Sequence, residues 1–385
     1  SMKIIKKGIK VSMKAIPHLK EKLTETFMKK EHEILPDISD PKEQLLAIRS
    51  PENRDDPVYP TMKKARTHSG TEELYYDLTV IIPVHNTGKY LHNCLYSVLN
   101  QECLYRLQII IVDDGSTDNS RDILKHFADL HIPGKDIQII NQEHAGLSAA
   151  RNVGLIQAEG KYLMFLDSED SLATGSLQNA VSELIREEAD FVQMQYIIKK
   201  GQRMKAGSRI KEGVYTDYSS MCRIPGSATM KIFRFSLFDN IWFPENYWFG
   251  DAVIPFRIYP KCQKAVVLSN IGYIYQKNIS KEGSDKEQMN RNLESILVLE
   301  KILMKKDLPD GYMDEVLRYF TFSIYDFLKY FPERTMQFAF LTACDMIQTI
   351  AQKPSEPYLE LYEAFQTRDY GIWKWYACKR RGKQL

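Results

Sequence analysis

The sequence predicts an α/β protein, in which a Rossmann-like domain with a mainly parallel sheet is preceded by a helical extension and followed by a helical domain. Between residues 78 and 166, short apolar runs alternate with helical patterns, and the connections are short. This alternation favours parallel strands joined by crossover helices. Beyond residue 286, apolar residues recur only at helical spacing. We therefore divide the chain into residues 1–77, 78–284 and 285–385, and the middle domain into halves, 78–170 and 171–284.

The composition is that of a soluble globular protein. The chain has 385 residues, of which 26% are charged and 44% hydrophobic, and its formal net charge of +2 gives no argument for binding nucleic acid. The six cysteines form no CxxC pair, so neither a zinc site nor a disulfide framework is predicted, and a reducing compartment fits. No apolar run approaches the roughly 20 residues that span a bilayer. We expect a cytoplasmic protein.

The N-terminal segment Met2–Lys30 has the pattern of a basic amphipathic helix. Apolar residues such as Ile5 and Ile9 fall at helical spacing among many lysines, and Pro17 interrupts the pattern. Such a helix can lie on an anionic membrane surface or pack, solvated, on the neighbouring domain, and both interpretations remain open. Residues 36–71 show no clear period and are expected to form a linker or a wrapping segment.

The elements of the middle domain follow in order from the apolar pattern. Its first half is expected to contain strands at Leu78–Val84, Gln108–Val112, Ile137–Asn141 and Tyr162–Leu166, with helices around 91–99, 123–130 and 146–158 between them. Its second half is expected to contain a helix around 177–185, strands at Phe191–Ile198, Ala265–Leu268 and Ile271–Gln276, and a helix after Asp251. Apolar stripes within 293–302 and 316–328 predict a small C-terminal helical bundle.

Polar residues gather where three of the predicted strands end. Pro83–His85, Asp113-Asp114 and Asp167–Asp170 should meet at one edge, because ligands of such sheets bind beyond the carboxyl ends of the strands. Carboxylates after a buried strand are costly unless a positive group meets them. A divalent metal that shares its oxygen ligands with a diphosphate fits this need. The simpler alternative is an acidic turn in which Asp170-Ser171 caps the next helix.

Five motifs in this order resemble family 2 glycosyltransferases of the GT-A fold, of the type that builds bacterial polysaccharides. The resemblance covers about residues 78–280 and rests on Val80–Asn86, Ser97–Gln101, Ile111–Asp118, Gly146–Gly154 and Phe165–Asp170. It implies transfer of a hexosyl or N-acetylhexosaminyl group, usually with inversion, from a nucleotide-diphosphate sugar to a hydroxyl of a glycan or lipid-linked glycan acceptor. A UDP-sugar is favoured, with Mn²⁺ or Mg²⁺ as cofactor. The alternatives are a GDP-sugar donor, or a degenerate GT-A protein that binds nucleotide or a partner protein without turnover.

The resemblance also implies roles for individual residues. In the nucleotide-sugar site, Asp114 would accept the N3–H of uracil or the N1–H of guanine, His85 would stack on the base, and Pro83 would touch it through its backbone. Arg151 would pair with the diphosphate or orient the aspartates. The metal ligands would come from Asp167, Glu169 and Asp170, although the family usually has Asp in place of Glu169. The remaining candidates for binding the nucleotide sugar are Asn86, Asp113, Asp167, Ser168 and Lys277, and Asp167 would meet the ribose or a metal-bound water.

The candidate catalytic base is Asp251. The family's base is the Asp of a Glu-Asp pair before a helix, and here Phe249-Gly250-Asp251 matches it with Gly250 in place of Glu. An inverting transferase needs a carboxylate that removes the proton of the acceptor hydroxyl. The alternative is that Asp251 only caps the helix after it.

The C-terminal tail combines aromatic and basic residues. Trp373, Trp375 and Tyr376 lie close to Lys379–Arg381, a combination typical of interfacial anchoring. We therefore expect peripheral contact with the inner face of the cell membrane, with a solvated tail as the alternative. The C-terminal helices could also form a homodimer.

Overall fold

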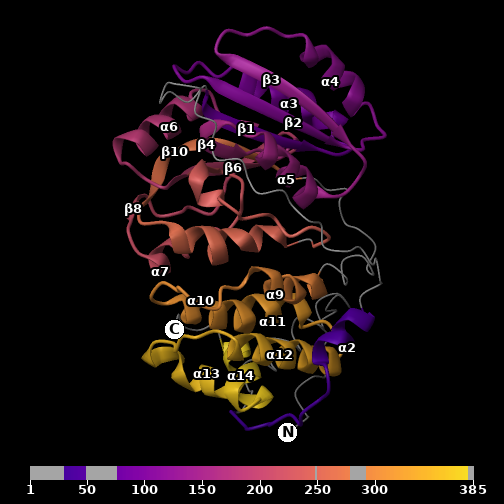
Figure 1. Cartoon of the computed structure of the whole chain (residues 1–385), viewed down its shortest axis with the longest axis vertical. Coiled ribbons are helices and arrows are strands. Elements are labelled where there is room, and N and C mark those ends of the chain that lie inside the picture. Colours follow the sequence, from indigo (N-terminus) through magenta and orange to yellow (C-terminus); the bar gives the residue numbers. More distant parts are fainter. Residues whose placement is uncertain (1–29, 49–75, 248, 278–291, 380–385) are drawn as a thin grey trace, which may run out of the picture. The chain divides into compact units, whose positions relative to one another are not determined.

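The computed structural model describes residues 30–48, 76–247, 249–277 and 292–379 (Figure 1). Its internal contacts divide the chain into two units, one formed by Leu46–Glu315 and the other by Ser1–Leu45 with Val316–Leu385. This division falls after Glu315, and the domain boundaries predicted at residues 77 and 284 stay predictions. The start of α10 (Tyr312–Arg318) packs in the first unit, where Tyr312 stacks on Tyr218 with ring centroids 5.7 Å apart. The predicted segment Met2–Lys30 lies, except for Lys30, outside the described residues.

The first half of the sheet confirms the predicted α/β pattern. Its strands are β1 (Tyr76–Val84), β2 (Leu107–Asp114), β3 (Lys135–Gln142) and β4 (Gly160–Phe165), joined by α3 (Gly88–Leu99), α4 (Ser120–Ala128) and α5 (Leu147–Gln157). All the pairings among these strands are parallel, in the order β3-β2-β1-β4. The sheet is doubly wound, because α3 and α4 share a core with Val80 and Ile82, whereas α5 packs on the other face with Gly154 against Ile81.

The second half of the sheet mixes directions. It contains β5 (Ser171–Leu172), β6 (Phe191–Lys200), β7 (Arg203–Ala206), β8 (Gly213–Tyr215), β9 (Lys231–Arg234) and β10 (Ala265–Gln276), together with α6 (Ser176–Arg186) and α7 (Tyr218–Met221). The full order is β3-β2-β1-β4-β9-β6-β10-β5. β9 is antiparallel to both β4 and β6, whereas β6 and β10 are parallel and form a long ladder. The strands predicted at Ala265–Leu268 and Ile271–Gln276 are a single strand, β10, whose register shifts between Val267 and Tyr273.

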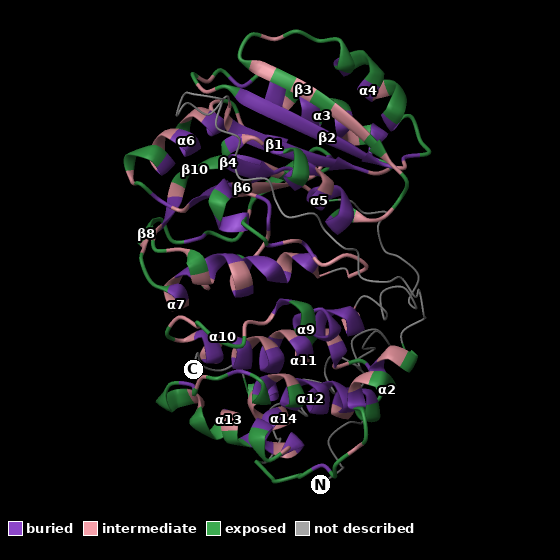
Figure 2. Cartoon of the chain, viewed as in Figure 1, coloured by how far each residue is buried: buried purple, intermediate pink, exposed green. Residues whose placement is uncertain are grey.

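Burial follows this architecture. β1 and β2 are almost wholly buried, whereas the edge strand β3 alternates between exposed and half-buried residues (Figure 2). The helix expected after Asp251 consists of three short pieces, η2 (Gly250–Ala252), η3 (Ile254–Ile258) and η4 (Tyr259–Lys261). Prolines in η3 and η4 explain why no single α-helix forms there.

The second unit is helical. After α10 it contains η5 (Tyr319–Ser323), α11 (Ile324–Leu328), α12 (Glu333–Gln348), η6 (Glu356–Tyr358), α13 (Leu359–Gln366) and α14 (Tyr370–Lys379). It also includes the first part of α2 (Pro41–Ile48), up to Leu45. The helix α9 (Leu299–Ile302) belongs to the first unit.

Part of the linker expected at residues 36–71 is helical, because α2 lies within it. The Asp40 side chain accepts a hydrogen bond from the Glu43 amide at 3.2 Å, and Leu45 is fully buried.

The predicted anchoring role of Trp373 is wrong. Its side chain is 2% exposed and lies 5.2 Å from Phe340 and 5.4 Å from Tyr370 between ring centroids, so it belongs to the core of the helical unit. The ring of Trp375 has Lys30 Nζ 4.7 Å from its centroid. Residues 380–385 lie outside the described part, and no helix within it is long and apolar enough to cross a membrane.

Candidate active site

The ends of β1, β2 and β4 meet, as the sequence predicted. Asn86, just after β1, accepts hydrogen bonds through Oδ1 from the amides of Thr117 (2.8 Å) and Asp118 (3.1 Å) after β2. Its neighbour Thr87 donates to Ser168 Oγ at 2.9 Å, after β4. Asn86 has a φ of +52°, a conformation that Asn adopts more readily than most residues. Asn86 and Ser168 therefore join the loops of the site to one another.

The adjacent aspartates at the end of β2 differ in their surroundings. Asp113 is fully buried, and its oxygens accept from the Ser116 amide at 3.1 Å and from Arg121 Nε at 2.7 Å. Both bonds hold the turn into α4. These contacts stabilise the loop beside Asp114, and the predicted role of Asp113 in binding the nucleotide sugar stays a prediction.

Asp114 accepts four hydrogen bonds through its carboxylate. Oδ1 receives Gln142 Nε2 and the Ala145 amide, both at 2.7 Å. Oδ2 receives His144 Nδ1 and the Gly146 amide, both at 2.9 Å. About four lone-pair positions are available on a carboxylate, so a nucleobase N–H would reach Asp114 most directly by replacing one of the two side chains.

His144 is a site residue that the sequence reasoning missed. Its ring stacks on His85 with centroids 4.0 Å apart, and His85 Nδ1 donates to the Asp114 carbonyl oxygen at 2.6 Å. His85, Asp114 and His144 each offer a ligand atom, and these atoms lie within 4.8 Å of one another. The signal was available, because His144 follows the predicted third strand, whose carboxyl end had to lie at the same edge.

Arg151 connects two of the predicted acidic residues. It projects from α5, is 2% exposed, and donates from Nη1 to Asp251 Oδ1 at 2.5 Å and from Nη2 to Asp167 Oδ1 at 3.2 Å. Its guanidinium lies 5.7 Å from the ring centroid of Phe165 and 5.2 Å from that of Phe243. Among the described residues its Nε has no hydrogen-bond partner. Arg151 therefore contacts both aspartates, an arrangement that fits either the expected role of orienting them or a structural salt bridge.

The acidic cluster after β4 brings the carboxylates of Asp167 and Asp170 close enough to influence each other's pKa. Asp170 is 3% exposed and accepts from Tyr273 Oη and the Gln276 amide, both at 2.7 Å. Burial, and then the charge of Asp167, raise the pKa of Asp170 to about 7. Burial also raises the pKa of Asp167, and Arg151 opposes that rise. These two carboxylates and the adjacent Glu169 offer the oxygen ligands that a hard divalent cation prefers.

Asp251 lies in η2, and both of its oxygens accept hydrogen bonds. Oδ1 bonds to Arg151, and Oδ2 accepts from the Ala228 amide at 3.2 Å. A Cβ on Gly250 would come within 2.6 Å of Ser148 Oγ, so a larger residue there requires that hydroxyl to move. Asn152, next to Arg151 on α5, exchanges hydrogen bonds with the Phe243 backbone at 2.8 and 2.9 Å. α5 thus anchors the segment that leads to Asp251.

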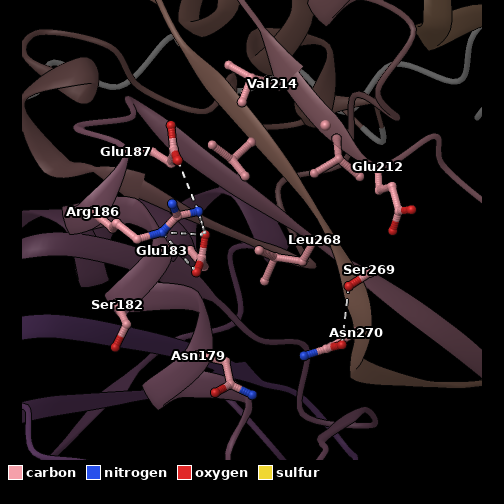
Figure 3. Close-up of a pocket in the computed structure, with 13 residues that line it drawn as sticks. Asn179, Ser182, Glu183, Arg186, Glu187, Glu212, Val214, Leu268, Ser269 and Asn270 are labelled. Carbon is pink, nitrogen blue, oxygen red and sulfur yellow. Dashed lines mark hydrogen bonds and ion pairs between the residues drawn. The ribbon is translucent and has the colours of Figure 1, made fainter.

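The remaining candidates lie around this centre. Pro83 pairs with Val112 between β1 and β2, and Lys277 follows β10 with an exposed side chain, one residue after the Gln276 amide that bonds to Asp170. A separate cavity of 410 Å³ lies along α6 and the first part of β10, where Arg186 pairs with Glu183 and Glu187 (Figure 3). It contains none of the candidate residues.

The sequence profile described as "Glycosyl transferase family 2" matches residues 79–244, the stretch that contains the three strand ends, Arg151 and the acidic cluster. Residues 79–244 form a family 2 glycosyltransferase domain. The predicted family is therefore confirmed, and Asp251 lies a few residues beyond the matched part of the glycosyltransferase domain.

Named relatives agree with this domain. The chain is 30% identical over 214 residues to "Glycosyltransferase GlyA" of Streptococcus pneumoniae. The matched residues cover 52% of this chain and 30% of GlyA. The chain is also 27% identical over 268 residues to "Minor teichoic acid biosynthesis protein GgaA" of Bacillus subtilis. This match covers 66% of this chain and 59% of GgaA. The chain thus spans less than two thirds of either relative.

The fold is also that of a solved structure. Residues 1–349 of S. aureus TarS, in complex with UDP-GlcNAc, superpose with a TM-score of 0.61 at 22% identity, over 80% of this chain and 93% of that one. This likeness confirms the GT-A fold predicted for the glycosyltransferase domain.

Proposed function

We propose that this protein is an inverting, metal-dependent glycosyltransferase that moves a sugar from a UDP-sugar to a hydroxyl of a glycan or lipid-linked glycan in bacterial cell-surface polysaccharide synthesis. One observation carries the proposal: Arg151 joins Asp251, the candidate base, to Asp167 of the acidic cluster. A base for the acceptor and an anionic cluster for a cation-bound diphosphate are the two parts that such a transfer needs.

In the proposed reaction, Asp251 takes the proton of the acceptor hydroxyl. The acceptor oxygen then forms a bond to the anomeric carbon, and the bond from that carbon to the phosphate oxygen breaks, so the nucleoside diphosphate leaves with the electron pair. Arg151 and the Ala228 amide hold the Asp251 carboxylate from its two oxygens and fix its direction.

Asp167, Glu169 and Asp170 are the residues that would hold the cation, Mn²⁺ or Mg²⁺. The bound cation would supply positive charge opposite the diphosphate as it leaves. Tyr273 and Gln276 hold the Asp170 carboxylate in place, and Lys277, which follows the same strand, would offer its positive charge to the diphosphate.

The donor assignment rests on the end of β2. Asp114 would accept the N–H of the nucleobase once the His144 side chain has moved away from Asp114. His85 would then stack on the nucleobase in place of the His144 ring. TarS is a fold neighbour in complex with UDP-GlcNAc, which supports a UDP-sugar with a hexosyl or N-acetylhexosaminyl group. GgaA is named for teichoic acid biosynthesis, which supports a surface polysaccharide as the product. A GDP-sugar is the alternative donor.

The proposal includes a place of action at the inner face of the membrane, where a lipid-linked acceptor would lie. The basic N-terminal sequence supports it, whereas the buried Trp373 does not. Sedimentation with anionic liposomes tests this part, and sedimentation equilibrium tests a homodimer through the C-terminal helices.

The first experiment is a thermal-shift panel of UDP, GDP, CDP and dTDP, with Mn²⁺, Mg²⁺ or EDTA. A ligand that binds only the folded state raises the melting temperature by mass action. A metal-dependent shift with UDP supports the proposed donor, and one with GDP alone replaces it. If no nucleotide shifts the melting temperature, the transferase proposal fails in favour of a degenerate, partner-binding protein.

A further inference from the structure

A lysine is buried beside the proposed base. Lys231, on β9, is 0% exposed, and its Nζ donates to the carbonyl oxygens of Pro225 (2.7 Å) and Ser227 (2.9 Å). Burial lowers the pKa of Lys231 to about 7, and the negative charge of Asp251 opposes that decrease. Burying an amine is costly, and an aliphatic side chain of similar length would fill the same volume at lower cost. Its two hydrogen bonds are therefore the feature to explain.

Those bonds fix the segment that contacts Asp251. The Pro225 carbonyl also accepts from Tyr259 Oη at 3.0 Å, and Thr229 forms an isolated parallel bridge to Phe165 at the end of β4. Between these fixed points, the Ala228 amide donates to Asp251 Oδ2 at 3.2 Å. Lys231 is thus linked to the candidate base through one short stretch of backbone.

The two oxygens of Asp251 are held in different ways. Oδ1 is held by Arg151, an ionic contact, and Oδ2 only by the Ala228 amide among its described partners. The direction of the Oδ2 lone pairs therefore depends on where the 225–228 backbone lies. Without the amine of Lys231, the Ser227 carbonyl would lose a buried donor, and the backbone would have to move to find another.

We propose that Lys231 is a positioning residue for the transfer reaction: by binding the Pro225 and Ser227 carbonyls, it holds the Ala228 amide against Asp251 and so aligns the carboxylate with the acceptor hydroxyl. The inference rests on the proposed function, because it gives Asp251 the role of base. It adds a residue that does not touch the substrates and that acts through the loop alone.

The test compares Lys231→Met with Lys135→Met in the full-length protein. Lys135 Nζ likewise donates to two carbonyl oxygens, those of Leu99 (2.6 Å) and Gln101 (2.7 Å), at the start of β3 and away from Asp251. Lys231→Met should lower kcat at least about tenfold and change the KM for the donor by less than about twofold, because an aligned base contributes to the chemical step. Lys135→Met should leave kcat unchanged within about twofold.

A purely structural role would give a different result. A positioning residue that acts through Asp251 should have no further effect on the residual rate in the Asp251→Asn background, whereas general damage to the fold would lower that rate again. Tyr259→Phe, which removes a single bond to the same loop, should lower kcat by a smaller factor and tests the inference if Lys231→Met does not fold. An unchanged kcat in folded Lys231→Met, or equal effects in both backgrounds, overturns it.

Hydrogen exchange separates this inference from the proposed function. The Ala228 amide should exchange at least about tenfold faster in Lys231→Met than in the wild type, and at the wild-type rate in Lys135→Met. If the wild type transfers no sugar, the function fails, while faster exchange at Ala228 still supports the positioning contact. If exchange at Ala228 is unchanged, the positioning contact fails, whatever the activity.

Discussion

Replacement of Arg151 by Met should destabilise the sheet-containing unit strongly. Arg151 is 2% exposed and donates to two carboxylates, and Met keeps much of its aliphatic volume while removing both donors. Removing one partner of a buried ion pair costs about 3–5 kcal/mol. The side chains of Asp167 and Asp251 are each 38% exposed and can regain water, so we expect the low end, about 3 kcal/mol.

The assay is differential scanning calorimetry of the full-length protein. For a unit of this size, a loss of about 3 kcal/mol lowers the melting temperature by about 6–12 °C. The matched control is Arg186→Met, since Arg186 is 65% exposed and pairs with Glu183 at 2.6 Å. Water screens an exposed ion pair, so the control should melt close to the wild type and well above Arg151→Met.

A second substitution checks the cause. Asp167→Asn should recover part of the stability lost in Arg151→Met, because the remaining cluster would then hold one charge fewer. A melting temperature of Arg151→Met within about 2 °C of the wild type would contradict a stabilising role of its ion pairs, as would an equally damaging Arg186→Met. A further loss of stability on the second substitution, by its full single-variant amount, would contradict that role too.

Three further predictions concern activity, metal and pH. Asp251→Asn should lower transfer by about 10²-fold or more and leave nucleotide affinity nearly unchanged, as measured by single-turnover kinetics and calorimetric titration; equal transfer removes Asp251 as the base. EDTA should abolish transfer and Mn²⁺ or Mg²⁺ should restore it, whereas in Asp170→Asn the metal concentration needed for half-maximal rate should rise; metal-independent transfer contradicts the cation site. The pKa of Lys231 is about 7 in the folded protein against an ordinary 10.5, so above pH 7 the unfolded chain binds more protons and stability rises with pH. Urea unfolding should show the wild type gaining about 2 kcal/mol between pH 7 and pH 9 relative to Lys231→Met, and parallel curves would show that Lys231 is charged in both states.

The local pattern of the sequence was enough to predict the first half of the sheet. Its strands are continuous apolar runs, and its helices repeat apolar residues at 3.6-residue spacing, so each element is specified by its own residues. The parallel arrangement then places the ends of β1, β2 and β4 together, which is why the sequence could predict that His85, Asp114 and Asp167 lie at one edge of the sheet.

The parts that were missed depend on tertiary contacts. In the sequence, Lys231 is a single charged residue in a short segment, and nothing local indicates that it is buried. Its burial depends on hydrogen bonds to the Pro225 and Ser227 carbonyl oxygens. His144 became a site residue only when the end of β3 was placed beside Asp114. Trp373 looked like an interfacial residue beside basic neighbours, although it packs against Phe340 from another helix, a contact that no local pattern encodes.

One guanidinium binds both aspartates, and under the proposed function this shared contact would make the donor and acceptor ends of the reaction thermodynamically dependent on each other. A cation that draws Asp167 away would leave Arg151 to interact more strongly with Asp251, whereas a proton on Asp251 would release Arg151 toward Asp167. Because linkage is reciprocal, the free energy by which donor binding favours an ionised base must equal the free energy by which an ionised base favours donor binding. Occupation of one half of the domain therefore reaches the other through a single side chain.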